Sequence, residues 1–138
     1  MSQENVAVVR KLFADFEAGD LAAVFSAFDA DIEWVEPYGY FAGAGGVRGL
    51  AAVEQVLATY PEVWSEFGLV PERFIDAGDD VVVTGAQRGV ARATGALYRG
   101  RFCNVWTLAG GKVVRMEAFT DTALMWKAFG AHPPGPEG

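Results

Sequence analysis

The second half of the chain alternates strand-like segments with short turns, and this pattern limits the possible folds more than any other feature. The four strand-like segments span residues 69–76, 81–92, 97–108 and 113–120. Short clusters rich in Gly and Asp separate them at 76–80, 93–95 and 110–111. Turns of this length connect neighbouring antiparallel strands. The sequence therefore predicts a mostly antiparallel sheet built from consecutive hairpins.

The first half has the three- and four-residue apolar spacing of amphipathic helices. Ser2 can cap a first helix, and its apolar stripe consists of Val6, Val9, Leu12, Phe13 and Phe16. Gly19 ends this helix, and Asp20 can cap a second, shorter one. A longer helix is expected over 50–67, with a kink or break near Thr59 because Pro61 lacks a backbone donor.

A short strand is expected between the second and third helices. The period changes to two over residues 31–36, which places Ile32, Trp34 and Glu36 on one face. Pro37 ends this strand, and a Gly- and aromatic-rich loop follows over 37–49. Asp121 can cap a last short helix that Gly130 stops.

Helices followed by a run of strands are typical of the α+β class, in which helices cover one face of an antiparallel sheet. A chain of 138 residues has the usual size of one domain. We therefore expect a single domain over residues 1–130 and a disordered tail over 131–138, where HPPGPEG has no apolar pattern.

Composition excludes several functions. The net charge of -7 and the scattered basic residues argue against nucleic acid, because phosphate binding needs clustered Lys and Arg. No apolar run approaches the roughly 20 residues of a membrane span, and the N-terminus does not resemble a signal peptide, so a cytoplasmic location is expected. Cys103 is the only cysteine and His132 the only histidine, which predicts neither a disulfide nor a metal site. No cofactor is expected.

Two polar residues lie among large apolar ones on predicted strand faces. Glu36 shares its face with Trp34, and burial there would raise its pKa toward that of a general base at neutral pH. The alternative is that Glu36 simply reaches water at the strand end. Asn104 shares a face with Phe102 and Trp106 and could orient a carbonyl. Its alternative is a core amide that bonds to backbone or water.

Residues 6–129 resemble a known family. The segments VVRKLFADFEAGDLAAVFSAFDADIEWVEP, RGVARATG and CNVWTLAGGKVVRMEAFTDTAL are similar to the ketosteroid isomerase and SnoaL-like branch of the NTF2-like superfamily. The resemblance implies a cone-like fold around an apolar pocket, and a homodimer formed through the open sheet face. It also implies a small apolar ligand bearing a carbonyl, and cofactor-independent isomerase, cyclase or lyase chemistry.

The resemblance also implies the site residues. Glu36 stands where ketosteroid isomerases carry the proton-shuttling aspartate, and Asn104 where they carry a hydrogen-bonding aspartate. Leu12 stands at the position of their oxyanion tyrosine and can donate nothing, so steroid isomerisation of the usual kind is not expected. The catalytic residues expected are Glu36 and Asn104. The expected pocket lining comprises Leu12, Phe16, Trp34, Tyr38, Leu57, Tyr60, Phe102, Trp106, Met116, Ala118 and Thr120.

Three alternatives stay open on the sequence. The first is a binding or accessory protein of the same fold without turnover. The second is an epoxide-hydrolase-like enzyme, for which Arg88 or Arg101 would have to face inward beside two aspartates. The third is a module that acts through protein contacts, which a large exposed apolar patch would indicate.

Overall fold

The computed structural model describes residues 2–131 and has four helices and six strands. Its helices are α1 (Ser2–Ala18), α2 (Leu21–Ser26), α3 (Leu50–Val63) and α4 (Thr122–Phe129). Its strands are β1 (Phe28–Val35), β2 (Val47–Arg48), β3 (Trp64–Ala77), β4 (Asp80–Ala91), β5 (Leu97–Ala109) and β6 (Lys112–Thr120). The predicted α+β class is confirmed.

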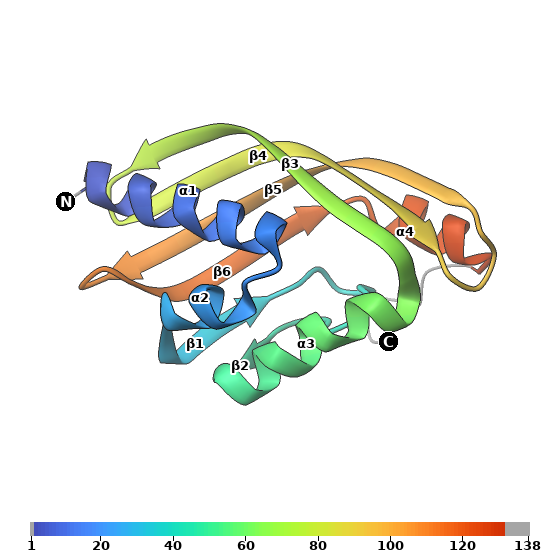
Figure 1. Cartoon of the computed structure of the whole chain (residues 1–138), viewed down its shortest axis with the longest axis horizontal. Coiled ribbons are helices and arrows are strands. Elements are labelled where there is room, and N and C mark those ends of the chain that lie inside the picture. Colours follow the sequence, from blue (N-terminus) through green and yellow to red (C-terminus); the bar gives the residue numbers. More distant parts are fainter. Residues whose placement is uncertain (1, 132–138) are drawn as a thin grey trace.

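The strands form one curved sheet in the order β2-β1-β6-β5-β4-β3. The hairpins β3–β4, β4–β5 and β5–β6 are antiparallel as predicted, whereas β1 pairs with β6 in parallel. The helix α1 lies along the concave side against β3 and β4, and α3 packs against β1 and β3 (Figure 1). The helices therefore cover one face of the sheet, and the space between them and the sheet holds the core.

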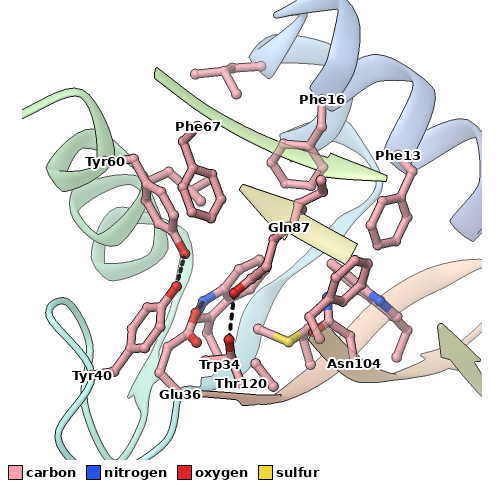
Figure 2. A pocket seen from close by; sticks show the side chains of 17 residues that line it. Phe13, Phe16, Trp34, Glu36, Tyr40, Tyr60, Phe67, Gln87, Asn104 and Thr120 are labelled. Carbon is pink, nitrogen blue, oxygen red and sulfur yellow. Dashed lines mark hydrogen bonds between the residues drawn. The ribbon is translucent and has the colours of Figure 1, made fainter. Parts of the chain in front are cut away.

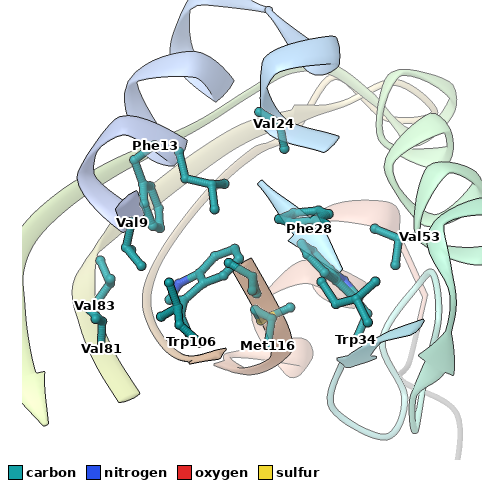
Figure 3. Packing of buried hydrophobic residues seen from close by; sticks show 14 of the residues in the cluster. Val9, Phe13, Val24, Phe28, Trp34, Val53, Val81, Val83, Trp106 and Met116 are labelled. Carbon is teal, nitrogen blue, oxygen red and sulfur yellow. The ribbon is translucent and has the colours of Figure 1, made fainter. Parts of the chain in front are cut away.

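Large side chains from both halves of the chain fill this space. Phe13 of α1 packs against Trp106 of β5, and Trp106 packs edge-on against Trp34 of β1 (Figure 3). Val81 and Val83 of β4 are fully buried beside them. The alternation of β4, in which every second residue is buried, is the period-two pattern expected of a half-buried strand.

The ends of two helices agree with their predicted caps. The Asp20 side chain accepts a hydrogen bond from the Ala23 backbone N–H, and Asp121 accepts one from that of Leu124. Gly130 ends α4 in the left-handed conformation, at a φ of 79°.

The third helix is shorter than predicted. Residues 64–67 begin the strand β3, so Trp64 and Phe67 are strand residues. The break expected near Thr59 does not occur, because Pro61 lies in the last turn and α3 continues to Val63. The two-residue strand β2 was not predicted, and β1 begins at Phe28, three residues earlier than expected. The predicted tail lies outside the described residues, except for Ala131.

Candidate functional site

A cavity of about 200 Å³ lies between the concave face of the sheet and the helices (Figure 2). Its walls are largely aromatic and aliphatic, with a few polar groups among them. The lining residues are Phe13, Phe16, Leu21, Trp34, Glu36, Tyr40, Leu57, Tyr60, Phe67, Leu69, Gln87, Phe102, Asn104, Trp106, Met116, Ala118 and Thr120.

Glu36 is the one carboxylate among these lining residues. It directly follows β1, where a bridge to Ala44 holds its backbone, and only 4% of it is exposed. Its Oε2 accepts a hydrogen bond of 2.8 Å from the Trp34 indole Nε1. Burial raises the pKa of Glu36 to about 8, and the Trp34 hydrogen bond lowers it only in part. Glu36 is therefore mostly neutral at pH 7, and its 4% exposure argues against the alternative that it reaches bulk water at the strand end.

The sheet register aligns Glu36 with the second candidate residue. Val35 pairs with Glu117 in the parallel ladder, so the next residues, Glu36 and Ala118, share a row. Ala118 in turn pairs with Asn104 of β5. With strands about 4.8 Å apart, the backbones of Glu36 and Asn104 are about 10 Å apart. The small Ala118 side chain lies between them, and it leaves space for a ligand in the cavity between Glu36 and Asn104.

Asn104 contributes an amide to the cavity wall. It is 9% exposed, and its side chain has no hydrogen-bond partner within residues 2–131. A satisfied core amide would have such a partner. The amide of Asn104 is therefore available to a ligand in the cavity.

Two tyrosines close the cavity next to Glu36. The hydroxyl oxygens of Tyr40 and Tyr60 are 2.5 Å apart, and Figure 2 shows both pointing inward from the loop 37–46 and from α3. Burial raises the pKa of each well above its ordinary value, and the negative charge of Glu36 adds to this effect. Both hydroxyls therefore keep their protons at any working pH.

The loop that carries Tyr40 is fixed at both of its ends. The indole Nε1 of Trp126 in α4 donates a 2.6 Å hydrogen bond to the Gly39 carbonyl. Gly43 has a φ of +66°, and a Cβ there would lie 2.7 Å from Val56 of α3. The loop can approach α3 this closely only because position 43 is glycine.

A third polar group comes from β4. The Oε1 of Gln87 accepts hydrogen bonds from the Tyr98 hydroxyl at 2.6 Å and from Thr120 Oγ1 at 2.5 Å. Gln87 is 6% exposed and lines the cavity. The hydroxyl hydrogens of Tyr98 and Thr120 are therefore both donated to Gln87. Thr120 lines the cavity but has no hydroxyl hydrogen left to donate to a ligand.

The structure brings together most of the side chains that the sequence nominated. Besides Glu36 and Asn104, the nominated residues that line the cavity are Phe16, Trp34, Leu57, Tyr60, Phe102, Trp106, Met116, Ala118 and Thr120. Leu12 is buried outside it, and the neighbouring Phe13 lines it instead. Tyr38 is 72% exposed and does not line it; Tyr40, two residues later, does.

The expected pocket lining left out six residues that line the cavity, namely Phe13, Leu21, Tyr40, Phe67, Leu69 and Gln87. A signal for Gln87 was present, because period two places it on the same face of β4 as Val81 and Val83. Phe67 was hidden by the misplaced end of α3. No local pattern distinguishes Tyr40 from Tyr38, since the difference arises from the loop conformation.

The remaining candidates lie away from the cavity. Arg101 pairs with Glu72 at 2.7 Å on an exposed surface, Arg88 is exposed, and Asp121 caps α4. None of the described residues that line the cavity is an arginine or an aspartate, so it lacks the constellation that an epoxide-hydrolase-like enzyme needs.

Within residues 2–131, no group of three or more His, Cys, Asp or Glu could hold a metal, and no helix is long and apolar enough to cross a membrane. His132 lies outside the described residues.

Comparison with known proteins identifies the family. The profile of the SnoaL-like domain matches residues 9–116. An NTF2-like protein of unknown function from Burkholderia pseudomallei is 31% identical, with a TM-score of 0.87 over 95% of this chain and 100% of the other. An NTF2-like protein from Burkholderia thailandensis is 32% identical, with a TM-score of 0.85 over 90% and 95%.

A further solved structure contains a ligand. TerC, co-crystallised with polyporic acid, is 30% identical to this chain, with a TM-score of 0.84 over 93% of this chain and 99% of TerC. No curated protein shows significant sequence similarity. The predicted resemblance is confirmed: the chain belongs to the SnoaL-like domain family and has the NTF2-like fold.

Proposed function

We propose that the cavity binds a small, mostly apolar molecule with a carbonyl group, and that Glu36 transfers a proton at the carbon beside that carbonyl. The observation that carries this proposal is a single carboxyl buried in an apolar cavity with a pKa of about 8. A proton donor and acceptor works best when its pKa lies near the operating pH. Among residues 2–131 no charged group forms a hydrogen bond with Glu36 and holds it in one protonation state, because its hydrogen-bond donor is the neutral indole of Trp34.

The proposed step begins with the ionised form of Glu36, about one-tenth of the protein at pH 7. Since Oε2 is bonded to Trp34, Oε1 takes the proton from the carbon. The electron pair of the broken C–H bond moves to the carbonyl oxygen, which becomes an enolate oxygen. The Asn104 amide donates a hydrogen bond to this oxygen, and Glu36 returns the proton to the same or a nearby carbon. A positioned proton-transfer group contributes about 10²- to 10⁴-fold in rate.

The cavity size limits the ligand. An apolar cavity of about 150 Å³ holds benzene, so a cavity of about 200 Å³ suits a molecule of one or two rings. TerC, which is 30% identical to this chain, was co-crystallised with polyporic acid, and this supports a small organic molecule as the ligand of the cavity.

Hydrogen exchange in heavy water tests the proposal. Proton NMR would follow the loss of the hydrogens beside the carbonyl of 1-indanone with wild type, with Glu36→Gln, and with Glu54→Gln as a control at an exposed site. We expect exchange with wild type and the control, and at least a hundredfold slower protein-dependent exchange with Glu36→Gln. Equal exchange in all three folded proteins would rule out Glu36 as the base.

The principal rival is binding without turnover. It is favoured by the missing donor at Leu12 and by the low acidity of the Asn104 amide. An arginine-bound Glu36 with a low pKa would have supported it further, but Glu36 has neither property. Binding of 1-indanone without protein-dependent exchange would favour this rival.

We also propose that the chain forms a homodimer through the outer face of the sheet. Phe119 on this face is 51% exposed, and Arg115 and Glu117 form a 3.0 Å ion pair close to it. Light scattering of wild type and Phe119→Asp tests this proposal, which requires a dimer that the aspartate weakens.

A further inference from the structure

The Tyr40–Tyr60 hydroxyl pair has more donor hydrogens than the protein uses. Each tyrosine hydroxyl carries one hydrogen, and only one of the two can lie between the oxygens that are 2.5 Å apart. In the described part of the chain neither hydroxyl has another partner. The second hydrogen is therefore left over at the cavity wall, where Tyr40 is only 6% exposed. A buried donor without an acceptor costs free energy, so this position favours a ligand that brings an acceptor.

The hydroxyl pair and Asn104 lie on opposite sides of Glu36. Asn104 follows Glu36 and Ala118 in the row across the sheet, whereas the tyrosines come from the loop after Glu36 and from α3. Figure 2 shows the tyrosines on one side of Glu36 and Asn104 on the other. The Glu36 carboxyl thus lies between two groups that can donate hydrogen bonds to a ligand, the hydroxyl pair and the Asn104 amide.

We propose that the Tyr40–Tyr60 hydroxyl pair is a second oxygen-binding site, and that the ligand carries two acceptor oxygens flanking the carbon that Glu36 addresses. This pattern is that of a 1,3-dicarbonyl compound or a vinylogous acid. The inference rests on the proposed function, because it assumes that Glu36 faces the reacting carbon. It adds a requirement that a simple ketone does not meet.

The donor pair suits such an oxygen chemically. The hydroxyl that donates to the ligand also accepts a hydrogen bond from its neighbour, and chains of hydrogen bonds strengthen one another. Both tyrosines stay protonated, since burial holds the pKa of each well above its ordinary value.

Binding measurements at pH 6, where Glu36 is neutral, test this inference without turnover. The probes are indane-1,3-dione and 1-indanone, which share one bicyclic frame and differ in the second carbonyl. The proteins are wild type, the double variant Tyr40→Phe/Tyr60→Phe, and Tyr38→Phe as a control at an exposed tyrosine outside the cavity. Replacing both partners of a hydrogen bond by rings of the same shape is nearly neutral for folding, so the double variant keeps the cavity.

We expect wild type and Tyr38→Phe to bind the dione about five- to tenfold more tightly than the monoketone, which is the contribution of one hydrogen bond. The double variant should lose this preference and keep its affinity for 1-indanone. In the infrared spectrum, the carbonyl bands of the bound dione should move back to higher wavenumber in the double variant.

Two results would overturn the inference. One is a wild type without preference for the dione, whether it binds both probes or neither; the other is a preference that survives in the double variant. If either result is found while 1-indanone exchange still depends on Glu36, only the second oxygen site is refuted and the proposed proton transfer stands. If wild type prefers the dione, the double variant loses this preference, and no Glu36-dependent exchange of 1-indanone is seen, only the proton transfer is refuted.

Discussion

Replacing Glu36 by glutamine is expected to make the protein more stable at alkaline pH. The pKa of Glu36 is about 8 in the folded protein against the ordinary 4.5 of an unfolded chain. Between these two values the folded state holds a proton that the unfolded state has lost, so stability falls as the pH rises. Below pH 4.5 both states are protonated and Glu36 costs nothing through ionisation.

The magnitude follows from the two pKa values. Each pH unit in this interval lowers the free energy of unfolding by about 1.4 kcal/mol. The interval from 4.5 to about 8 therefore amounts to about 5 kcal/mol at pH 8 and above. Glutamine has nearly the same shape as the neutral acid and cannot ionise, so Glu36→Gln escapes this penalty.

Urea unfolding followed by tryptophan fluorescence at pH 5 to 9 measures the effect. The difference in free energy of unfolding between Glu36→Gln and wild type should grow with pH and level off above about pH 8. Other titrating groups cancel in this difference. Glu36→Met, which is also uncharged, should give the same slope with a different offset. A difference that stays constant from pH 5 to 9 would refute a neutral, buried Glu36.

Three further substitutions have expected outcomes. Ala118→Leu fills the space between Glu36 and Asn104, so 1-indanone exchange should fall at least about tenfold while the melting temperature does not drop; unchanged exchange would contradict this placement. Trp34→Phe removes the hydrogen bond that lowers the pKa of Glu36, so a carbon-13 titration of the Glu36 carboxyl should show a midpoint above that of wild type; a lower midpoint would contradict it. Asn104→Leu removes an amide without a partner, so urea unfolding should show no loss of stability, while the affinity for 1-indanone falls about fivefold; a large loss of stability would indicate a structural amide instead.

The period of the apolar residues was sufficient to predict most of the fold. Strand alternation placed Glu36 beside Trp34, and turn residues located the three hairpins of the sheet. The end of α3 could not be predicted, because Tyr60, Trp64 and Phe67 continue the helical spacing, and the strand β3 begins with a register shift between Trp64 and Glu66 that breaks simple alternation. The chain leaves the helix at Trp64 because β3 pairs with β4 from that residue onward, and this pairing is a tertiary interaction.

The site was predictable where regular elements carry it. Asn104, Trp106 and Ala118 follow from strand alternation and from the family resemblance. Tyr40 does not, because its position depends on the Gly43 conformation and on the contact between Trp126 and Gly39. Irregular loops are set by such long-range contacts, which no local period reveals.

The pH dependence of 1-indanone exchange tests the central claim most directly. The base form of Glu36 appears as the pH rises through its pKa, so the protein-dependent rate should increase with a midpoint near 8 and then level off. The rate measured with Glu36→Gln gives the background catalysed by hydroxide and buffer. A rate that does not change with pH after this subtraction, or one with a midpoint near 4.5, would contradict the account of Glu36 as a buried proton-transfer group.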